Sequence, residues 1–231
     1  MHLLASLVAI FMLAIGACSD ARTDADLNAQ TPSQAPRQTT PLTTTAPDES
    51  LPVAYFAGGC FWCTEASFER IAGVQAVVSG YSGGKKRNPT YQEVAAGQTQ
   101  YAEAIAIYYD SSIVDYPTLL DVFFVAHDPT TLNRQGPDKG PQYRSAIFFQ
   151  DKKEEAQARA AISRVDQAKR YANPVVTEVT AFRKFYPAED YHQGYYELNP
   201  SNSYILNVSR PKVIKVEKEF SDILKPVYEK S

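Results

Sequence analysis

The motif GGCFWCTE at residues 58–65 constrains the fold of this chain more than any other feature. It follows a short apolar segment, Val53 to Ala57, which predicts a buried strand, and it opens the segment 61–72, which predicts a helix. Two glycines between a strand and a helix indicate a tight turn. The chain must therefore place two cysteines with CxxC spacing where a strand passes into a helix.

This position favours redox chemistry at Cys60 and Cys63. The first amide N–H groups of a helix lack partners inside the helix and carry a partial positive charge. We therefore expect a thiol at this position to have a lowered pKa and a higher reactivity. Cys63 lies one helical turn further on and on the same face, so the two sulfurs can form a disulfide with modest local adjustment.

The N-terminus has the pattern of a targeting segment. Its apolar run, Leu3 to Ile15, is too short for a typical membrane span but has the length of a signal-peptide core. The run ends in small residues directly before Cys18, a pattern that resembles the bacterial lipobox, although no Lys or Arg precedes it. We predict a lipoprotein-type signal peptide, residues 1–18, whose Cys18 becomes a lipid anchor. An ordinary cleaved signal peptide is the alternative.

The rest of the chain divides into a tether and one domain. Residues 19–50 are rich in Thr, Pro and Ala and have no aromatic residue, which predicts a disordered, partly extended tether. Residues 51–231 are numerous enough to bury a full core as one catalytic domain. The whole chain has a net charge of −3, and residues 1–50, with two Arg and five acidic residues, account for all of it. The near-neutral domain gives no sign of binding nucleic acid, which favours a clustered basic face.

The pattern of the domain predicts an α+β fold. Strands and helices alternate as β-α-β and then β-α-β-α-β, which indicates helices packed on a mixed sheet. We expect a two-layer sandwich with a ferredoxin-like βαβ core and an extended C-terminal segment. The predicted strands are 53–57, 74–81, 102–109, 144–149 and 175–180, the predicted helices are 61–72, 116–126, 151–171 and a docking helix within 211–226, and 82–90 and 127–143 are predicted loops.

Beyond GGCFWCTE, several other motifs follow in order along the domain, and together they make a family recognisable. The whole set resembles the motifs of the A-type peptide methionine sulfoxide reductases and covers nearly all of residues 52–230. The further motifs are GYSGG at 80–84, NPTY at 88–91, YAE at 101–103, HDPTT at 127–131, QGPDKGPQYRS at 135–145, EDYHQ at 189–193 and NP at 199–200.

The resemblance implies the roles of the site residues. Reduction of a sulfoxide needs a soft nucleophile to attack the sulfur, which matches Cys60, and an acid to protonate the oxygen, which matches Glu103. Burial beside aromatic rings would raise the pKa of that carboxyl and keep it protonated. The implied substrate is the S epimer of methionine sulfoxide, in proteins or free. The other implied site residues are Tyr91 and Tyr143, as donors to the sulfoxide oxygen, Asp138, as a polar residue of the same site, and Phe61 and Trp62, as the pocket for the methyl group.

The resemblance also implies how the enzyme is recycled. Oxygen transfer leaves a sulfenic acid on Cys60, and Cys63 is the candidate to resolve it as a disulfide. An external dithiol, thioredoxin or a similar protein, would then reduce that disulfide, with no bound cofactor and no metal. The chain departs from the family pattern in two places. It has no cysteine after the Asn-Pro motif, and Tyr101 replaces a histidine, which we expect to affect pocket polarity more than chemistry.

Other readings of the same residues remain open. A thioredoxin-like thiol-disulfide oxidoreductase would use the CxxC motif and would not need Glu103. A cysteine hydrolase would pair Cys60 with His127, and Cys63 would then be dispensable. A zinc site needs about four ligands. Beyond the two cysteines only His127 and His192 remain as soft ligands, and there is no second pair of cysteines. A lipid-anchored binding module gives no reason for the CxxC motif.

Several candidates also have plain structural interpretations. Tyr91 and Tyr143 can be half-buried strand residues, and His127 and His192 are more often structural than catalytic. Arg144 is expected to be a salt-bridge partner.

We predict a lipid-anchored, extracytoplasmic enzyme of the bacterial periplasm that repairs oxidised proteins.

Overall fold

The computed structural model describes residues 46–229. The predicted signal peptide with Cys18 and most of the predicted tether lie outside this range. The described end of the tether, residues 46–50, is largely exposed and leads into the first strand. Within the described range, no helix is both long enough and apolar enough to cross a membrane.

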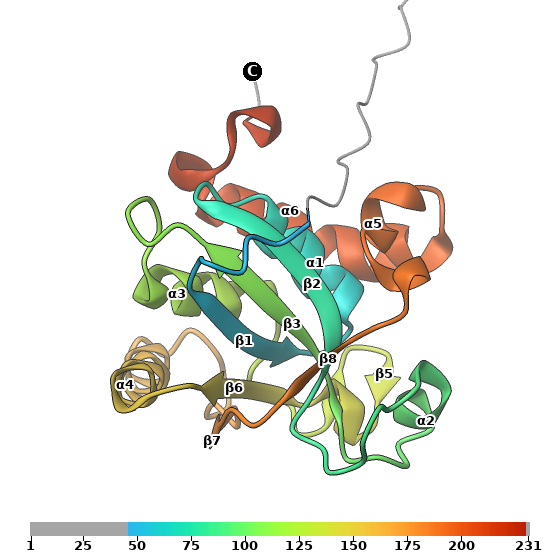
Figure 1. The fold of residues 1–231 in the computed structure, drawn as a ribbon. Helices are drawn as coiled ribbons and strands as arrows, with labels where there is room; N and C mark the ends of the chain where they lie inside the picture. Colours follow the sequence, from blue (N-terminus) through green and yellow to red (C-terminus); the bar gives the residue numbers. More distant parts are fainter. Residues whose placement is uncertain (1–45, 230–231) are drawn as a thin grey trace, which may run out of the picture. The chain divides into compact units, whose positions relative to one another are not determined.

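A mixed sheet of six strands in the order β7-β6-β1-β3-β2-β8 forms the centre of the fold (Figure 1). The four inner strands pair antiparallel throughout, whereas β7 runs parallel to β6. The strands are β1 (Val53–Gly58), β2 (Val74–Ser82), β3 (Ala102–Tyr109), β6 (Ser145–Phe149), β7 (Glu178–Ala181) and β8 (Phe185–Pro187), with a separate pair of β4 (Arg134–Gln135) and β5 (Asp138–Lys139). The helices are α1 (Phe61–Glu69), α2 (Tyr91–Ala95), α3 (Tyr116–Ala126), α4 (Lys152–Gln167), α5 (Tyr195–Leu198) and α6 (Arg210–Glu219), with a π-helical turn at Ile205–Ser209.

The sheet must curl, because its two edge strands are joined by a very short link. β7 and β8 lie at opposite edges of the sheet, yet only residues 182–184 separate them in the chain. Five strand spacings in a flat sheet amount to about 24 Å, whereas a link of this length spans at most about 14 Å. In Figure 1 the orange chain accordingly runs from β7 across the sheet to β8.

The main core lies between one face of the sheet and the helices α1, α3, α4 and α6. Phe56 of β1 is the centre of an aromatic cluster, with its ring 5.0 Å from that of Phe123 and 5.9 Å from that of Phe68. The helix α3 begins where the sequence predicts it, because the Asp115 carboxylate accepts a hydrogen bond from the amide of Thr118 at 2.9 Å. The apolar face of α3 packs against β1, and the C-terminal end of β1 leads into the site.

The opposite face of the sheet is covered by the chain that links β7 to β8. The ring of Phe182 stacks on Tyr55 with centroids 4.0 Å apart. The neighbouring positions on this face are small, with Ala102 and Ala104 on β3 fully buried. Because successive residues of a strand point to opposite faces, Glu103 lies on the helical side of β3, together with Ile105.

The structure confirms the α+β class, the mixed sheet and most of the predicted elements. β3 and α3 have the predicted bounds, and the C-terminal helix docks on α1 and α3. The helix α1 ends at Glu69 rather than at residue 72, and Ile71 instead forms a bridge to Leu224. Gly73 then makes the turn with a φ of +84°.

Short elements such as α2, β8 and α5 were not predicted. The segment 127–143, predicted to be a loop, contains the β4–β5 pair and a 3-10 turn at Pro141–Tyr143. These elements are too short to show a hydrophobic period, so the sequence pattern gives no sign of them.

The turn before α1 requires a glycine. Gly59 has a φ of +89°, and a Cβ there would overlap the side chain of Gln135. Cys60 follows directly as the N-cap residue of α1. β1 ends and β3 begins at the same end of the sheet, because the two strands are antiparallel. Cys60 and Glu103 are thereby brought together.

We predict that Gly80→Ala destabilises the protein by about 2–3 kcal/mol, the upper part of the usual range for an overpacked site. A Cβ at Gly80 would overlap the carbonyl of Tyr186 and the ring of Phe185, so β8 would have to move away from β2. Urea unfolding of both variants measures the effect. Gly136→Ala is the control, because no atom lies within 4 Å of its Cβ and only its φ of +58° is unfavourable. That strain costs about 1 kcal/mol, and an equal loss in both variants would contradict the prediction.

Candidate active site

Cys60 lies where the sequence places it, but its environment favours the thiol. It is the N-cap residue of α1 and is only 6% exposed. Burial raises the pKa of Cys60 well above its ordinary value, and the neighbouring Cys63 and the Glu103 carboxyl raise it further. The expectation of a lowered pKa at this position is therefore wrong for Cys60, because burial outweighs the charge of the helix terminus.

Cys63 is the thiol whose environment favours the charged form. The thiol of Cys63 donates a hydrogen bond to the Ser209 hydroxyl at 3.2 Å, and the Lys212 ammonium lies 3.9 Å from the sulfur. The pKa of Cys63 is lowered to about 7, first by a hydrogen bond from Cys60 and then, against burial, by Lys212 and Ser209. Both thiols are free and buried.

The Glu103 carboxyl is held as an acid beside the thiols. It lies at the start of β3, is 2% exposed, and its Oε2 accepts a hydrogen bond from the Phe61 amide at 3.1 Å. Burial raises the pKa of Glu103 to about 8, and the Asp138 carboxylate adds to the effect, while the Phe61 amide opposes it. At neutral pH this carboxyl keeps its proton and can donate it.

Tyr91 is positioned by the segment that follows β8. The carboxylate of Glu189 accepts hydrogen bonds from the Tyr91 amide and from the Tyr81 hydroxyl, both at 2.9 Å. The ring of Tyr91 lies 4.3 Å from that of His192. Burial raises the pKa of Tyr91 to about 12, and the carboxyl of Glu103 is the next largest cause. The phenol thus keeps its proton and can donate a hydrogen bond.

Asp138 and Tyr143 belong to the same group of side chains, and Tyr204 joins them. The Tyr204 hydroxyl donates a hydrogen bond to Asp138 and lies within hydrogen-bonding reach of Cys60. Burial raises the pKa of Tyr143, and Glu103 and Asp138 raise it further, which shows that these carboxyls lie close by. The sequence analysis missed Tyr204, although it lies shortly after the Asn-Pro motif.

Phe61 and Trp62 form an aromatic cluster with His192. Phe61 is buried, with its ring 5.0 Å from that of His192. Trp62 is half-buried, stacks on Tyr195 at 3.8 Å and donates from Nε1 to the Nδ1 of His192 at 3.1 Å. This bond makes Nδ1 the acceptor, so the proton of the neutral imidazole is on Nε2.

His127 is a structural residue. Its Nδ1 lies 2.7 Å from the carbonyl of Phe123 and its Nε2 lies 2.7 Å from the hydroxyl of Ser145. Burial lowers the pKa of His127 to about 4. With both ring nitrogens occupied, His127 does not serve Cys60 as a base, and the hydrolase alternative loses its second residue.

Two further expectations have clear outcomes. Arg144 is a salt-bridge partner, with its Nε 3.2 Å from Glu178. Tyr101 is buried and donates to the carbonyl of Lys86 at 2.6 Å, and its ring packs edge-on against Tyr186. These contacts make Tyr101 a support for the loop after β2, and they do not support an effect on pocket polarity.

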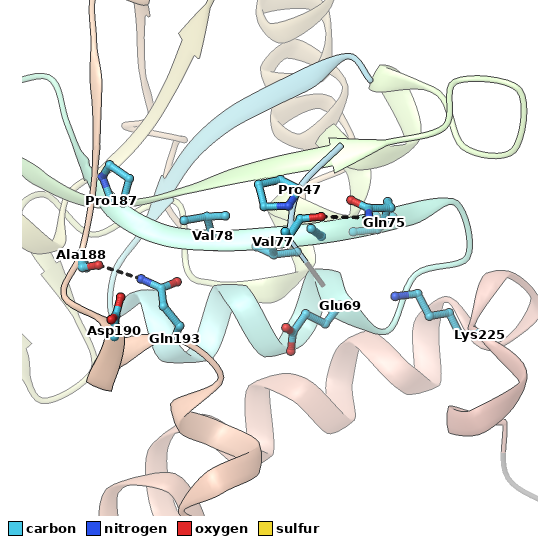
Figure 2. Close-up of a pocket in the computed structure, with 13 residues that line it drawn as sticks. Pro47, Glu69, Gln75, Val77, Val78, Pro187, Ala188, Asp190, Gln193 and Lys225 are labelled. Carbon is cyan, nitrogen blue, oxygen red and sulfur yellow. Dashed lines mark hydrogen bonds between the residues drawn. The ribbon is translucent and has the colours of Figure 1, made fainter. Parts of the chain in front are cut away.

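A cavity of about 290 Å³ lies beside the last turn of α1 (Figure 2). Its lining includes Glu69, Gln193, Lys225 and the edge of β2 from Val74 to Val78. Burial raises the pKa of Glu69 to about 7. None of the predicted site residues lines this cavity, so it is separate from the thiol pair.

Among residues 46–229, no group of three or more His, Cys, Asp or Glu side chains is placed to hold a metal ion.

The structure thus brings all eight predicted site residues into one neighbourhood around the N-terminal turn of α1. Two thiols of unequal pKa beside a protonated carboxyl and phenol donors can accept an oxygen atom and release it as water. This fold and site define a thiol-dependent oxidoreductase.

Comparisons with known proteins identify the family. The model of the family "Peptide methionine sulfoxide reductase" matches residues 52–224. The peptide methionine sulfoxide reductase MsrA of Chromobacterium violaceum is 47% identical over 171 residues, covering 74% of this chain and 97% of the relative. MsrA 1 of Rhodopirellula baltica is 50% identical over 173 residues, covering 75% of this chain and 89% of the relative.

Solved structures agree. Methionine sulfoxide reductase A of Corynebacterium diphtheriae is 32% identical with a TM-score of 0.62, and the match covers 67% of this chain and 78% of that one. Mxr1 of Saccharomyces cerevisiae in reduced form is also 32% identical with a TM-score of 0.62, with 68% and 91% covered. The chain belongs to the peptide methionine sulfoxide reductase family and is an enzyme that reduces methionine sulfoxide.

We predict that Glu103→Gln stabilises the protein at neutral pH. The pKa of Glu103 is about 8 in the folded chain against an ordinary value of 4.5. The unfolded chain therefore loses this proton first, and wild-type stability falls as the pH rises from the lower value to the higher one. Glutamine has no proton to lose, so the variant should be more stable by about 3 kcal/mol at about pH 7.5 and nearly unchanged at about pH 4.5.

Urea unfolding at the two pH values checks this prediction. The exposed Glu229, replaced by Gln, is the control and should change stability at neither pH. A Glu103→Gln variant that gains no stability at the higher pH would show that the carboxyl is ionised in the fold. The same substitution should lower turnover by a factor of about 10² to 10⁴, as expected for a lost general acid.

Proposed function

We propose that the protein reduces methionine-S-sulfoxide with Cys60 as nucleophile, Glu103 as general acid and Cys63 as resolving thiol. The observation that carries this proposal is the buried Glu103 carboxyl, whose pKa of about 8 keeps a proton next to Cys60. A thioredoxin-like disulfide exchanger needs no such acid, because thiol-disulfide exchange moves no oxygen.

In the first step Cys60 attacks the sulfur of the sulfoxide, and Glu103 donates its proton to the oxygen. The Cys60 proton needs an acceptor, and the sulfur of Cys63, to which Cys60 donates a hydrogen bond, is within reach. The oxygen is transferred to Cys60 as a sulfenic acid, and the methionine thioether leaves. Tyr91 and Tyr143 would hydrogen-bond the oxygen as its negative charge develops.

In the second step Cys63 attacks the sulfur of the Cys60 sulfenic acid. The S–S bond forms, the S–O bond breaks, and the oxygen leaves with a proton as water. An external dithiol, thioredoxin or a similar protein, then reduces the Cys60–Cys63 disulfide and is itself oxidised. Phe61 and Trp62 are the proposed pocket for the substrate's methyl group, and Asp138 holds the Tyr204 hydroxyl beside Cys60.

Turnover of three forms of the enzyme tests this mechanism. We expect wild type to reduce a peptide with methionine-S-sulfoxide using either dithiothreitol or thioredoxin. Cys60→Ser should be inactive with both reductants. Cys63→Ser should complete only a single turnover with thioredoxin, because no intramolecular disulfide forms.

The R epimer of the same peptide is the control substrate and should not be reduced. If Cys63→Ser turns over repeatedly with thioredoxin, Cys63 is not the resolving thiol. If wild type reduces neither epimer but exchanges disulfides, the thioredoxin-like alternative replaces this proposal.

The inner strands support the ferredoxin-like two-layer core predicted from the sequence. Two βαβ units, β1-α1-β2 and β3-α3-β6, interleave in the order β6-β1-β3-β2 with antiparallel neighbours. Cys60 lies between β1 and α1 of the first unit, and Glu103 lies near the start of β3 in the second unit. The site therefore joins the two halves of the core.

We also propose that the enzyme is anchored by lipid at Cys18 and works in the bacterial periplasm. The support is the sequence pattern alone, a short apolar run followed by small residues and a cysteine. In a Gram-negative host, wild type should fractionate with membranes, and Cys18→Ala should not. Mass spectrometry of the mature N-terminus separates the outcomes, since an unmodified N-terminus on wild type would indicate an ordinary signal peptide.

A further inference from the structure

The C-terminal segment places two polar groups on the sulfur of Cys63. Ser209 is fully buried, and its hydroxyl accepts a hydrogen bond from the Cys63 thiol at 3.2 Å, so the same hydroxyl is placed to donate to the sulfur when it is a thiolate. The ammonium of Lys212 lies 3.9 Å from the same sulfur. Neither residue belongs to the group of acid and tyrosines around Cys60, so the two thiols have different surroundings.

The local backbone fixes both groups toward α1. Ser209 ends the π-helical turn Ile205–Ser209 and is the N-cap residue of α6. A π turn takes up one more residue than an α turn, and such turns are frequent at functional sites. Lys212 is three residues further on and therefore on the same face of α6. The next residue, Val213, is fully buried and holds this face against its neighbours.

We propose that Ser209 and Lys212 activate Cys63 as the resolving thiol by holding its sulfur as a thiolate next to Cys60. The proposal rests on the proposed function, in which Cys63 attacks the Cys60 sulfenic acid. Cys63 passes the proton that it took from Cys60 to the Glu103 carboxylate, and the Cys63 thiolate supplies the electron pair of the new S–S bond. The S–O bond breaks, and the leaving oxygen takes this proton from Glu103 to become water. Lys212 acts as a fixed positive charge and takes no part in the proton transfers.

The other groups that face Cys63 do not replace this charge. Cys60 donates a hydrogen bond, which favours the thiolate, whereas the Asp138 carboxylate disfavours it. Glu103, on β3, interacts with Cys63 and is neutral at neutral pH in the resting enzyme, and Tyr204 keeps its phenol proton. A buried thiolate without a nearby cation is costly. The pKa of Cys63, about 7, agrees with the contribution of Lys212.

Titration of Cys63 tests the proposal without any turnover. The Cys60→Ser background leaves Cys63 as the cysteine to titrate in the domain, and serine keeps a hydrogen-bond donor beside it. Thiolate formation is followed by ultraviolet absorbance against pH in four proteins, which are the background itself and its Lys212→Met, Lys212→Arg and Lys215→Met derivatives. Lys215 is the matched control, because it lies on the same helix but its ammonium is 5.6 Å above the ring of Tyr171.

We expect Lys212→Met to move the midpoint upward by about one pH unit, which lowers the thiolate fraction at neutral pH about fivefold. Lys212→Arg should keep the midpoint low, and Lys215→Met should leave it unchanged. Ser209→Ala should give a smaller upward shift. If Lys212→Met and Lys215→Met titrate alike, the proposal is overturned. Near-ultraviolet circular dichroism checks that each variant is folded. If Lys212→Met does not fold, Lys212→Gln replaces it in the titration.

The resolution step gives the second readout. In the chain with both thiols, one equivalent of methionine-S-sulfoxide is added without reductant, and methionine formation and free-thiol loss are followed separately. Lys212→Met should form the disulfide, after methionine has been released, about fivefold more slowly than Lys215→Met at neutral pH. Methionine release should slow by no more than this factor, because Cys63 also accepts the Cys60 proton in the first step. Equal rates of thiol loss would overturn the proposal. Failure of wild type to release methionine would instead contradict the proposed function, while the titration result would stand.

Discussion

The hydrogen bond from the Phe61 amide to the Glu103 carboxyl joins the sheet to the helix that carries both thiols. It connects the first turn of α1 to the start of β3, and both partners are buried. An amide at a helix N-terminus has no partner within the helix, so a buried carboxyl there satisfies it. The same bond fixes the distance between the acid and Cys60. The geometry of the site therefore depends on how β1, α1 and β3 meet.

Burial determines the protonation states in this site more strongly than the helix terminus does. The charge of a helix end is worth about 0.3–1 kcal/mol near the surface, whereas full burial can shift a pKa by several units at about 1.4 kcal/mol each. The raised pKa of Cys60 and of Glu103 follow from this balance. Cys63, one turn further on, has a lowered pKa, first because Cys60 donates a hydrogen bond to it and then because α6 brings an ammonium and a hydroxyl to it. Groups of unequal pKa are what an enzyme needs for a reaction that moves protons as well as an oxygen.

The sequence predicts the elements that have a strong hydrophobic period and misses those that tertiary contacts create. β3 and α3 are long and apolar, and their predicted bounds agree with the structure. The curl of the sheet depends on a link of three residues, 182–184, which has no pattern of its own. Tyr204 and Glu189 were missed as site residues for the same reason. Each lies in an irregular C-terminal segment, and only the fold shows that Glu189 holds Tyr91 and that Tyr204 reaches Cys60.

The C-terminal segment completes the site because it is bound tightly to α1. Arg70, buried at the end of α1, pairs with Glu197 at 3.0 Å and with Glu217 at 2.8 Å. The amide of Gly194 donates to the buried Glu65 at 3.1 Å. These contacts hold α5 and α6 against the C-terminal half of α1, and α6 in turn holds Ser209 and Lys212 at Cys63.

This arrangement explains how the chain can work without a cysteine in its C-terminal segment. In the proposed mechanism the segment contributes charge and a hydrogen bond to the resolving thiol, Cys63 on α1, in place of a resolving thiol of its own. Because a disulfide sulfur carries no charge, formation of the Cys60–Cys63 bond removes the partner of the Lys212 ammonium. On the proposed mechanism we therefore expect the contact between α6 and α1 to be weaker in the oxidised protein than in the reduced one, at the point where an external dithiol would have to reach a buried disulfide.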